Sequence, residues 1–230
     1  MNNVPIITID GTTGSGKGTV GILLAKRLNW HFLDSGAVYR ALALIASEQN
    51  IAADDEKALG NLANNFKIKC KNTDNFRVFY MERDITEAIR TEECGIFASK
   101  IAVLLAVRNG LLACQRGFEQ LPGLVADGRD MGTVVFPEAK LKIFLDAKPE
   151  ERALRRQKQL QQCGISANFH EILRDLVARD ERDAKRALAP LKPAADSLII
   201  DSTNLGIDEV VLSILEQVKL RNMIAQGATF

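Results

Sequence analysis

The sequence predicts an α/β fold in which a parallel sheet of roughly five strands is flanked by helices, with one small antiparallel β insertion. Three observations indicate this class. Short apolar runs alternate along the chain with segments of helical periodicity. The first run leads directly into a glycine-rich loop and then into a helix. Between positions 66 and 83 the periodicity changes to alternation, which is typical of short antiparallel strands.

The elements of the first half follow from periodicity and from helix-boundary residues. Ser35 stands immediately before a helical pattern, so we expect it to be the N-cap of the second helix. Pro122 and Gly123 end the last helical stretch of this half. The expected elements are a strand at 4–9, a short apolar segment at 30–33, helices at 20–28, 36–48, 54–65 and 85–120, and two strands on either side of a turn at 71–75.

The second half continues the alternation of buried strands and helices. A loop and turn through Pro137 is expected to join its first two strands, and the Cys163-Gly164 pair is expected to form a turn between two charged helices. The expected elements are strands at 124–126, 141–145 and 197–201, and helices at 150–162, 169–188 and 208–223.

The composition favours a single folded domain, residues 1–230, over a disordered chain. Of the 230 residues, 47% are hydrophobic, which is enough to bury a large core. The net charge of +1 gives no reason to expect nucleic acid or an anionic membrane as a partner. The sequence shows no signal segment, no long apolar run and no Cys-x-x-Cys pair among its four cysteines. We therefore expect a cytoplasmic protein with reduced thiols and no membrane contact.

The glycine-rich loop at 10–19 is the most informative motif. It fits G-x-x-x-x-G-K, ending at Lys17, and lies between a strand and a helix as that motif requires. Backbone N–H groups and a helix N-terminus converge there on phosphate oxygens, while Lys17 adds a positive charge. Gly18 replaces the hydroxyl residue that usually follows the lysine, and Thr19 comes one place later. This change weakens direct ligation of Mg²⁺ by the loop.

A second charged group, at 127–130, follows the strand at 124–126, and so should lie where open α/β sheets bind ligands. Asp127 is suited to hold Mg²⁺ directly or through water, Arg129 to bind phosphate, and Asp130 to accept a hydrogen bond from an exocyclic amine. An ordinary surface turn is the alternative interpretation of this tetrapeptide.

Two helices carry arginine patches. The first patch is Arg152, Arg155 and Arg156, and the second is Arg179, Arg182, Asp183 and Arg186. The spacing of each patch places its members on one helix face, which by itself is also typical of a solvated surface. Guanidinium groups suit a transferred phosphoryl group because they bind its oxygens bidentately. We therefore expect the two helices to form a mobile lid that excludes water.

Taken together, these motifs resemble the bacterial cytidylate kinases, a family of P-loop nucleoside monophosphate kinases. The segment 127–137 is highly specific to that family. The matching segments are 7–11, 14–19, 33–40, 89–91, 126–137, 142–146, 179–183 and 189–191. The resemblance implies a P-loop kinase fold with a helical lid, and a β insertion in the monophosphate-binding region. It also implies ATP-dependent phosphorylation of CMP and dCMP to CDP and dCDP in pyrimidine nucleotide metabolism.

The resemblance further implies roles for individual residues. The residues expected to bind ATP are Gly11, Thr12, Thr13, Gly14, Ser15, Gly16, Lys17, Gly18, Thr19, Arg152 and Arg156. The residues expected to bind the acceptor phosphate are Ser35, Arg40 and Arg129, and those expected to bind cytosine are Ser99, Arg108 and Asp130. The ribose is expected to contact Arg179 and Asp183, and Arg186 and Asp127 are expected to lie beside the phosphates. Those expected to act in catalysis are Lys17, Asp127, Arg129, Arg179 and Arg186.

The resemblance also divides the domain and names its cofactor. The core is expected at 1–34, 85–148 and 189–230, the monophosphate-binding region at 35–84, and the lid at 149–188. Mg²⁺ is expected to arrive with ATP and to be held by Thr19 and Asp127 through water, without a direct side-chain ligand. We expect a monomer, because no apolar stripe beyond the needs of the core is apparent.

Two alternative functions remain open from the sequence. A P-loop kinase for another nucleoside monophosphate or for a small metabolite has the same chemistry, and the cytosine-reading residues argue against it. A regulatory switch that hydrolyses its nucleotide belongs to a different class. Against the switch, the sequence lacks an Asn-Lys-x-Asp guanine motif, and a second anion site would have no purpose. Because a phosphate oxygen is already ionised, no general base is needed, and we expect His31 and His170 to be structural or surface residues.

Overall fold

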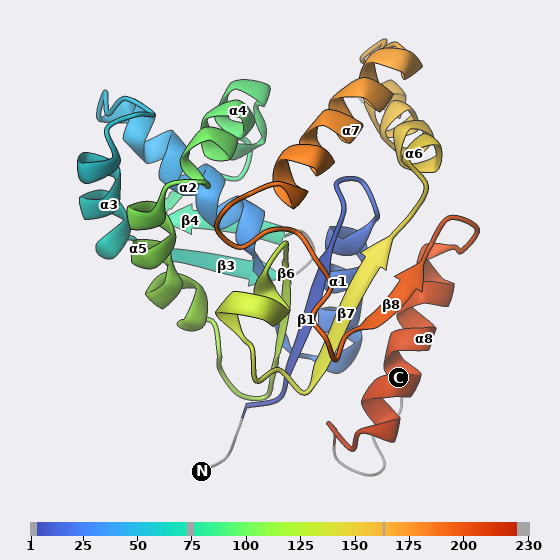
Figure 1. The fold of residues 1–230 in the computed structure, drawn as a ribbon. Coiled ribbons are helices and arrows are strands. Elements are labelled where there is room, and N and C mark those ends of the chain that lie inside the picture. The colour runs from blue at the N-terminus through green and yellow to red at the C-terminus, as the bar shows by residue number, and fades with distance from the viewer. Residues whose placement is uncertain (1–3, 73–75, 163, 225–230) are drawn as a thin grey trace.

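Five parallel strands form the centre of the molecule (Figure 1). The computed structural model describes residues 4–72, 76–162 and 164–224. The strand order in the sheet is β2-β6-β1-β7-β8. Their bounds are β1 Ile6–Gly11, β2 His31–Asp34, β6 Leu124–Gly128, β7 Leu141–Asp146 and β8 Leu198–Asp201. This confirms the predicted five-stranded parallel sheet of the α/β class.

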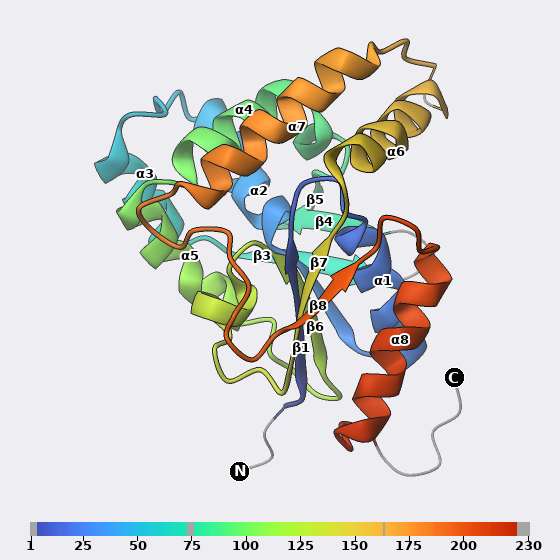
Figure 2. The same ribbon diagram turned by 45° about the vertical axis from the view of Figure 1, so that its right-hand side comes forward.

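Helices cover both faces of this sheet. Helices α1 (Lys17–Leu28) and α8 (Ile207–Leu220) pack on one face (Figure 2). Helices α2 (Ser35–Glu48) and α5 (Leu105–Arg116) pack on the other. Side chains alternate across a strand, and in β1 Ile7 therefore joins the first core while the preceding Ile6 joins the second. Both isoleucines are buried, and the sheet is thus enclosed between two apolar layers.

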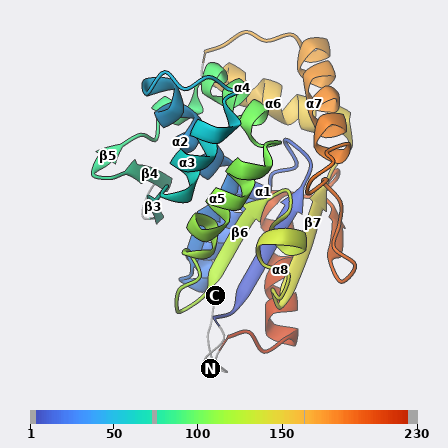
Figure 3. The same ribbon diagram turned by 60° about the vertical axis from the view of Figure 1, so that its left-hand side comes forward.

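The β insertion lies at one edge of the molecule (Figure 3). It forms the predicted antiparallel sheet, with β3 at Ile68–Asn72, β4 at Phe76–Tyr80 and β5 at Arg83–Asp84. Residues 73–75 of the expected turn at 71–75 lie outside the described residues. Helix α3 (Glu56–Asn64) contacts α5, and α4 (Glu92–Ile101) contacts α2.

The two predicted lid helices cross the carboxyl ends of the strands, above the glycine-rich loop (Figures 1 and 2). They are α6 (Pro149–Gln162) and α7 (Phe169–Ala184), which share a small apolar core of their own. Of the expected turn between them, Cys163 lies outside the described residues, and Gly164 has a φ of 75°. Helix α7 ends at Ala184 and not at 188, so Arg186 lies beyond the helix.

Three local predictions were wrong. The N-cap of α2 is Asp34, whose carboxylate accepts a hydrogen bond from the Ala37 N–H, and Ser35 is already helical. The segment after β6 includes a π-helix, Met131–Val135, where a loop was expected. The single helical stretch at 85–120 is divided into a 3₁₀ turn, α4 and α5, and the Thr91 hydroxyl accepts from the Cys94 N–H at the start of α4.

No single helix in the described part of the chain is both long and apolar enough to cross a membrane. Helices α4 and α5 meet that criterion of length and composition only when taken together, and they are bent by 107° to each other.

Candidate active site

The glycine-rich loop between β1 and α1 has a backbone that only glycine adopts easily. Gly14 and Gly16 have φ values of 80° and 92°, in the left-handed region. A Cβ atom added to Gly11 would lie 1.9 Å from the carbonyl oxygen of Leu145 in the adjacent strand. The loop therefore takes a fixed path over the end of the sheet. The hydroxyl groups of Thr12 and Ser15, both expected to bind ATP, form hydrogen bonds that hold it there. The Thr12 hydroxyl donates to Asp146 Oδ1 at 2.6 Å, and the Ser15 hydroxyl donates to the Thr12 carbonyl at 3.0 Å.

Lys17 is buried beneath this loop. Its Nζ donates to the carbonyl oxygen of Thr12 at 2.8 Å. Burial, with the positive charge of Arg129 as the next cause, lowers the pKa of Lys17 to about 7. The ammonium group therefore donates to a neutral carbonyl, and a phosphate would supply an anionic partner.

Asp127 lies below the loop because β6 pairs with β1, and Asp127 stands opposite Ile9 in that register. The Oδ1 atom of Asp127 is buried without a hydrogen-bond partner. A Cβ atom on Gly18 would lie 3.2 Å from the Oδ2 atom, so this carboxylate faces the loop. Burial raises the pKa of Asp127 to about 7, although Lys17 lowers it. An orphaned carboxylate oxygen at this position suits a hydrated cation.

The loop and Asp127 do not form a closed metal centre on their own. Among the described residues, no group of three or more His, Cys, Asp or Glu side chains gathers as a metal site would require. Thr19 is exposed on α1. The donor set therefore fits a cation that keeps most of its water and binds with phosphate oxygens, as Mg²⁺ does with ATP.

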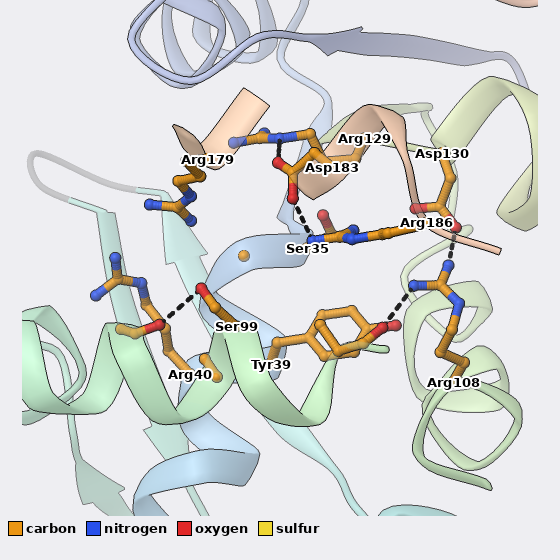
Figure 4. Close-up of a pocket in the computed structure, with 14 residues that line it drawn as sticks. Ser35, Tyr39, Arg40, Ser99, Arg108, Arg129, Asp130, Arg179, Asp183 and Arg186 are labelled. Carbon is orange, nitrogen blue, oxygen red and sulfur yellow. Dashed lines mark hydrogen bonds and ion pairs between the residues drawn. The ribbon is translucent and has the colours of Figure 1, made fainter. Parts of the chain in front are cut away.

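A second pocket opens beside the loop, under α7 (Figure 4). It brings together nine of the ten residues expected to bind CMP, and the tenth, Asp127, lies at the loop instead. The nine are Ser35, Arg40, Ser99, Arg108, Arg129, Asp130, Arg179, Asp183 and Arg186. They come from α2, α4, α5, the end of β6, α7 and the segment after α7. Residues more than 150 positions apart in the chain therefore share one cavity.

The pocket carries an excess of positive charge. Five guanidinium groups and two carboxylates line it. Asp183, which is 4% exposed, accepts a hydrogen bond from Arg129 Nε at 2.9 Å and pairs with Arg186 on its other oxygen. Burial and the neighbouring Arg129 lower the pKa of Arg179 to about 10. An arrangement of this kind attracts an anion with more than one negative charge.

Arg108 and Asp130 form a buried ion pair at one end of the pocket, as Figure 4 shows. Their side chains are 10% and 7% exposed. Burial raises the pKa of Asp130, and the positive charges of Arg108 and Arg186 oppose that rise. Ser99 lies on α4 along the lower side of the pocket in this view and donates to the Gly95 carbonyl at 2.9 Å. This end thus offers a carboxylate, a hydroxyl and guanidinium donors to a flat polar group.

Arg40, at the opposite end, is held by the backbone. Its Nη1 donates to the carbonyl oxygen of Ile89 at 3.0 Å. Arg40 and Arg179 lie at this end of the cavity (Figure 4), and neither forms an ion pair among the described residues.

Arg152 and Arg156, both expected at ATP, have different surroundings. Arg152 is buried and donates to the Thr13 carbonyl at 2.8 Å and to Asp180 Oδ2 at 2.5 Å. Its guanidinium group therefore holds the loop through the Thr13 carbonyl. Arg156 is exposed and donates to Gln159 at 2.8 Å on the same helix, away from the loop.

Three residues of the site were not singled out by the sequence. Tyr39 lines the pocket beside the Arg108–Asp130 pair, and burial raises its pKa to about 12, so its hydroxyl stays protonated. Asp10 accepts hydrogen bonds from the N–H groups of Met131 and Gly132, both at 2.8 Å, and so fixes the π-helix that follows Asp130. Asp180 contacts the loop. The carboxylate at the first position of the glycine-rich segment 10–19 was the available signal for Asp10.

Comparisons with known proteins agree with this geometry. The family model described as cytidylate kinase matches residues 7–220. A cytidylate kinase from Aeromonas hydrophila is 54% identical over 212 residues, which is 92% of each chain. One from a Marinomonas species is 55% identical over 213 residues, covering 92% of this chain and 94% of the relative. One from Klebsiella pneumoniae is 48% identical over 224 residues, covering 97% and 99%. The chain therefore belongs to the cytidylate kinase family.

Proposed function

We propose that the protein transfers the γ-phosphoryl group of ATP to CMP and dCMP. The observation that carries this proposal is the position of the pocket, which joins a cationic end to a buried Arg108–Asp130 pair beside the glycine-rich loop. A loop for the donor phosphates and a separate anion site with a base-sized polar end suit a reaction of two nucleotides. Membership of the cytidylate kinase family supports the same substrates.

The Arg108–Asp130 end suits cytosine. The exocyclic amine of cytosine would donate to Asp130 and to the Ser99 hydroxyl, while Arg108 would donate to the ring acceptors. Uracil carries a carbonyl group in place of that amine, which would face the Asp130 carboxylate and leave buried polar groups unpaired. The cationic end, with Arg40, Arg129 and Ser35, would hold the acceptor phosphate.

The reaction needs little covalent help from the protein. An oxygen of the CMP phosphate forms a bond to the γ-phosphorus while the bond from that phosphorus to the bridging oxygen of ADP breaks, in line. Lys17, Arg129, Arg179 and Arg186 stabilise the negative charge spread over the transferred group. Asp127, with Thr19 through water, would hold the Mg²⁺ that comes with ATP, and this cation neutralises the β- and γ-phosphates when bound.

In this proposal the lid helices protect the transferred phosphoryl group. The helices at 149–188 would close over the transferred group and exclude water, which would otherwise accept the phosphoryl group. The region at 35–84 would contribute Ser35 and Arg40 to the monophosphate, and the other seven expected CMP-binding residues of the pocket lie outside that region. The exposed Arg156 would have to move toward the loop to reach ATP.

The direct test is a panel of acceptors with ATP and Mg²⁺. We expect phosphorylation of CMP and dCMP, with kcat/KM for UMP and AMP lower by a factor of about 10² or more, because the pocket pairs with the cytosine amine. Coupled detection of ADP checks this result. Shikimate is the control for a small-metabolite kinase. Equal rates on all acceptors, or hydrolysis of ATP stimulated only by a partner protein, would contradict the proposal.

Binding of ATP at about pH 8 without Mg²⁺ is expected to take up protons, approaching one per site. The pKa of Lys17 is about 7 in the free protein, so most molecules carry the neutral amine at that pH. Negative phosphate oxygens stabilise the ammonium form and raise this pKa, and they also raise the pKa of Asp127. The affinity for ATP therefore falls as pH rises above 7.

Calorimetry in EDTA measures this uptake, with two buffers of different ionisation enthalpy at the same pH. Lys17→Met is the matched control and should lose most of the proton uptake. A titration with equal apparent heats in both buffers would show that the Lys17 amine is already charged in the free protein.

A further inference from the structure

All three polar groups of Thr13, in the glycine-rich loop, are held by residues from other elements. Its N–H donates to Asp180 Oδ1 at 3.0 Å, and its carbonyl accepts from Arg152 Nη1 at 2.8 Å. Its hydroxyl accepts from Arg129 Nη2 at 3.0 Å. Asp180 lies in α7, Arg152 in α6 and Arg129 after β6. The loop is therefore tied to both lid helices.

Asp180 is central to these contacts because it uses both of its oxygens. Oδ1 accepts from the loop, and Oδ2 accepts from Arg152 at 2.5 Å. The two side chains of this ion pair are 16% and 4% exposed, for Asp180 and Arg152 respectively. Removing the carboxylate would leave a buried guanidinium group with only carbonyl partners, and would release the Thr13 N–H.

Helix α7, which carries Asp180, also reaches the second pocket, here called the acceptor pocket because it is the proposed CMP site. Asp183, one turn beyond Asp180, lines that pocket and accepts a hydrogen bond from Arg129 Nε at 2.9 Å. Arg129 in turn contacts Thr13. These contacts form a closed ring that runs from Thr13 to Asp180, along α7 to Asp183, and back through Arg129. A shift of the loop and a shift of α7 are therefore linked.

We propose that Asp180 is a positioning residue that couples occupancy of the ATP loop to the arrangement of the acceptor pocket. Phosphates that fix the loop would fix Thr13, and Asp180 would pass that constraint to α7 and so to Asp183 and Arg179. The inference rests on the proposed function, since it takes the loop as the donor site and the pocket as the CMP site. The coupling is reciprocal, because each ligand then favours the same arrangement of α7.

Calorimetric titration of CMP, with and without a non-hydrolysable ATP analogue and Mg²⁺, tests this coupling. In the wild-type protein we expect the analogue to tighten CMP binding by at least about fivefold. The ratio of the Kd for CMP without the analogue to the Kd with it should fall at least about twofold in Asp180→Ala, because only the route through Arg129 then joins Thr13 to Asp183. The Kd for CMP without the analogue should change by less than about twofold, since Asp180 does not line the acceptor pocket.

Glu181→Ala is the matched control. Glu181 is the next carboxylate of α7, is 59% exposed and pairs with Lys185 of the segment that follows. Its loss should leave the ratio unchanged. Thermal melting shows whether each variant folds. If Asp180→Ala does not fold, Asp180→Asn keeps the side-chain shape but removes the charge that faces Arg152, and it should lower the ratio in the same direction.

Two results would overturn the inference and leave the proposed function standing. The first is a wild-type protein in which the analogue does not change the Kd for CMP. The second is a folded Asp180 variant in which the analogue tightens CMP binding as much as in the wild type. A wild-type protein that binds ATP but no CMP would instead overturn the proposed function, and this inference with it.

Discussion

Replacing Lys17 with methionine is expected to lower kcat for CMP phosphorylation by a factor of about 10³, the upper end for loss of one preorganised charge. Lys17 is buried under the loop, and its only hydrogen-bond partner in the described structure is the Thr12 carbonyl. Because the Thr12 carbonyl is neutral, the ammonium group remains available to the phosphoryl oxygens, on which negative charge develops during transfer. Methionine fills a similar volume without the charge. Steady-state kinetics with saturating CMP measures the loss.

The same variant should keep or slightly raise the melting temperature. Burial has already lowered the pKa of Lys17 to about 7, which means that the folded state disfavours its charge. Removing the amine therefore removes an unfavourable term of the folded protein. Differential scanning calorimetry provides the check. A large drop in melting temperature together with the loss of activity would show that Lys17 supports the loop and not the reaction.

Replacing Asp130 with alanine is expected to lower kcat/KM for CMP by a factor of about 10³ to 10⁴, as for a site that loses a buried hydrogen-bonding group. Alanine removes the acceptor proposed for the cytosine amine and leaves Arg108, which is 10% exposed, without its carboxylate. The Kd for ATP should stay within about threefold, because Asp130 belongs to the pocket and not to the loop. Separate titrations of CMP and ATP distinguish the two effects.

Asp130→Asn is the comparison variant. It keeps one oxygen for Arg108 and places an amide donor beside the base, which suits the carbonyl of uracil better than the amine of cytosine. The ratio of kcat/KM for CMP over UMP should therefore narrow. Equal loss of ATP and CMP binding in Asp130→Ala would show that this carboxylate organises the whole site and does not recognise the base.

Much of the fold was accessible from sequence because its signals are local. The strands are apolar runs bounded by turn residues, and the glycine-rich loop carries backbone requirements that Gly14 and Gly16 satisfy directly. The acceptor pocket was accessible in another way. Its residues are scattered over α2, α4, α5 and α7, and only the resemblance to a family, not any spacing, grouped them before the structure did.

The local errors arose where neighbouring residues had similar propensity or where a distant contact decided the structure. Asp34 and Ser35 are both good N-caps, and the end of β2 at Asp34 decides between them. The π-helix at Met131–Val135 is too short to show a period, and it is anchored by Asp10, more than 100 positions away. Such contacts have no local signal.

The arginine patches show a further limit. Arg152 and Arg156 are four positions apart and share a helix face by spacing, yet only Arg152 is buried against the loop. It lies in the first turn of α6, where the helix meets the loop, whereas Arg156 lies one turn farther away and is exposed. Spacing indicates a direction around a helix axis, but not the distance from the rest of the protein.

The excess of guanidinium groups around the acceptor pocket has a consequence for the lifetime of the protein. Three of the five guanidinium groups pair with Asp130 or Asp183, and we expect repulsion within the remaining excess of positive charge to lower the stability of the native state. An anion that fills the cavity relieves the repulsion and stabilises only the native form, in proportion to its concentration over its Kd. We therefore expect the resistance of the chain to heat and to proteases to rise with the nucleotide concentration.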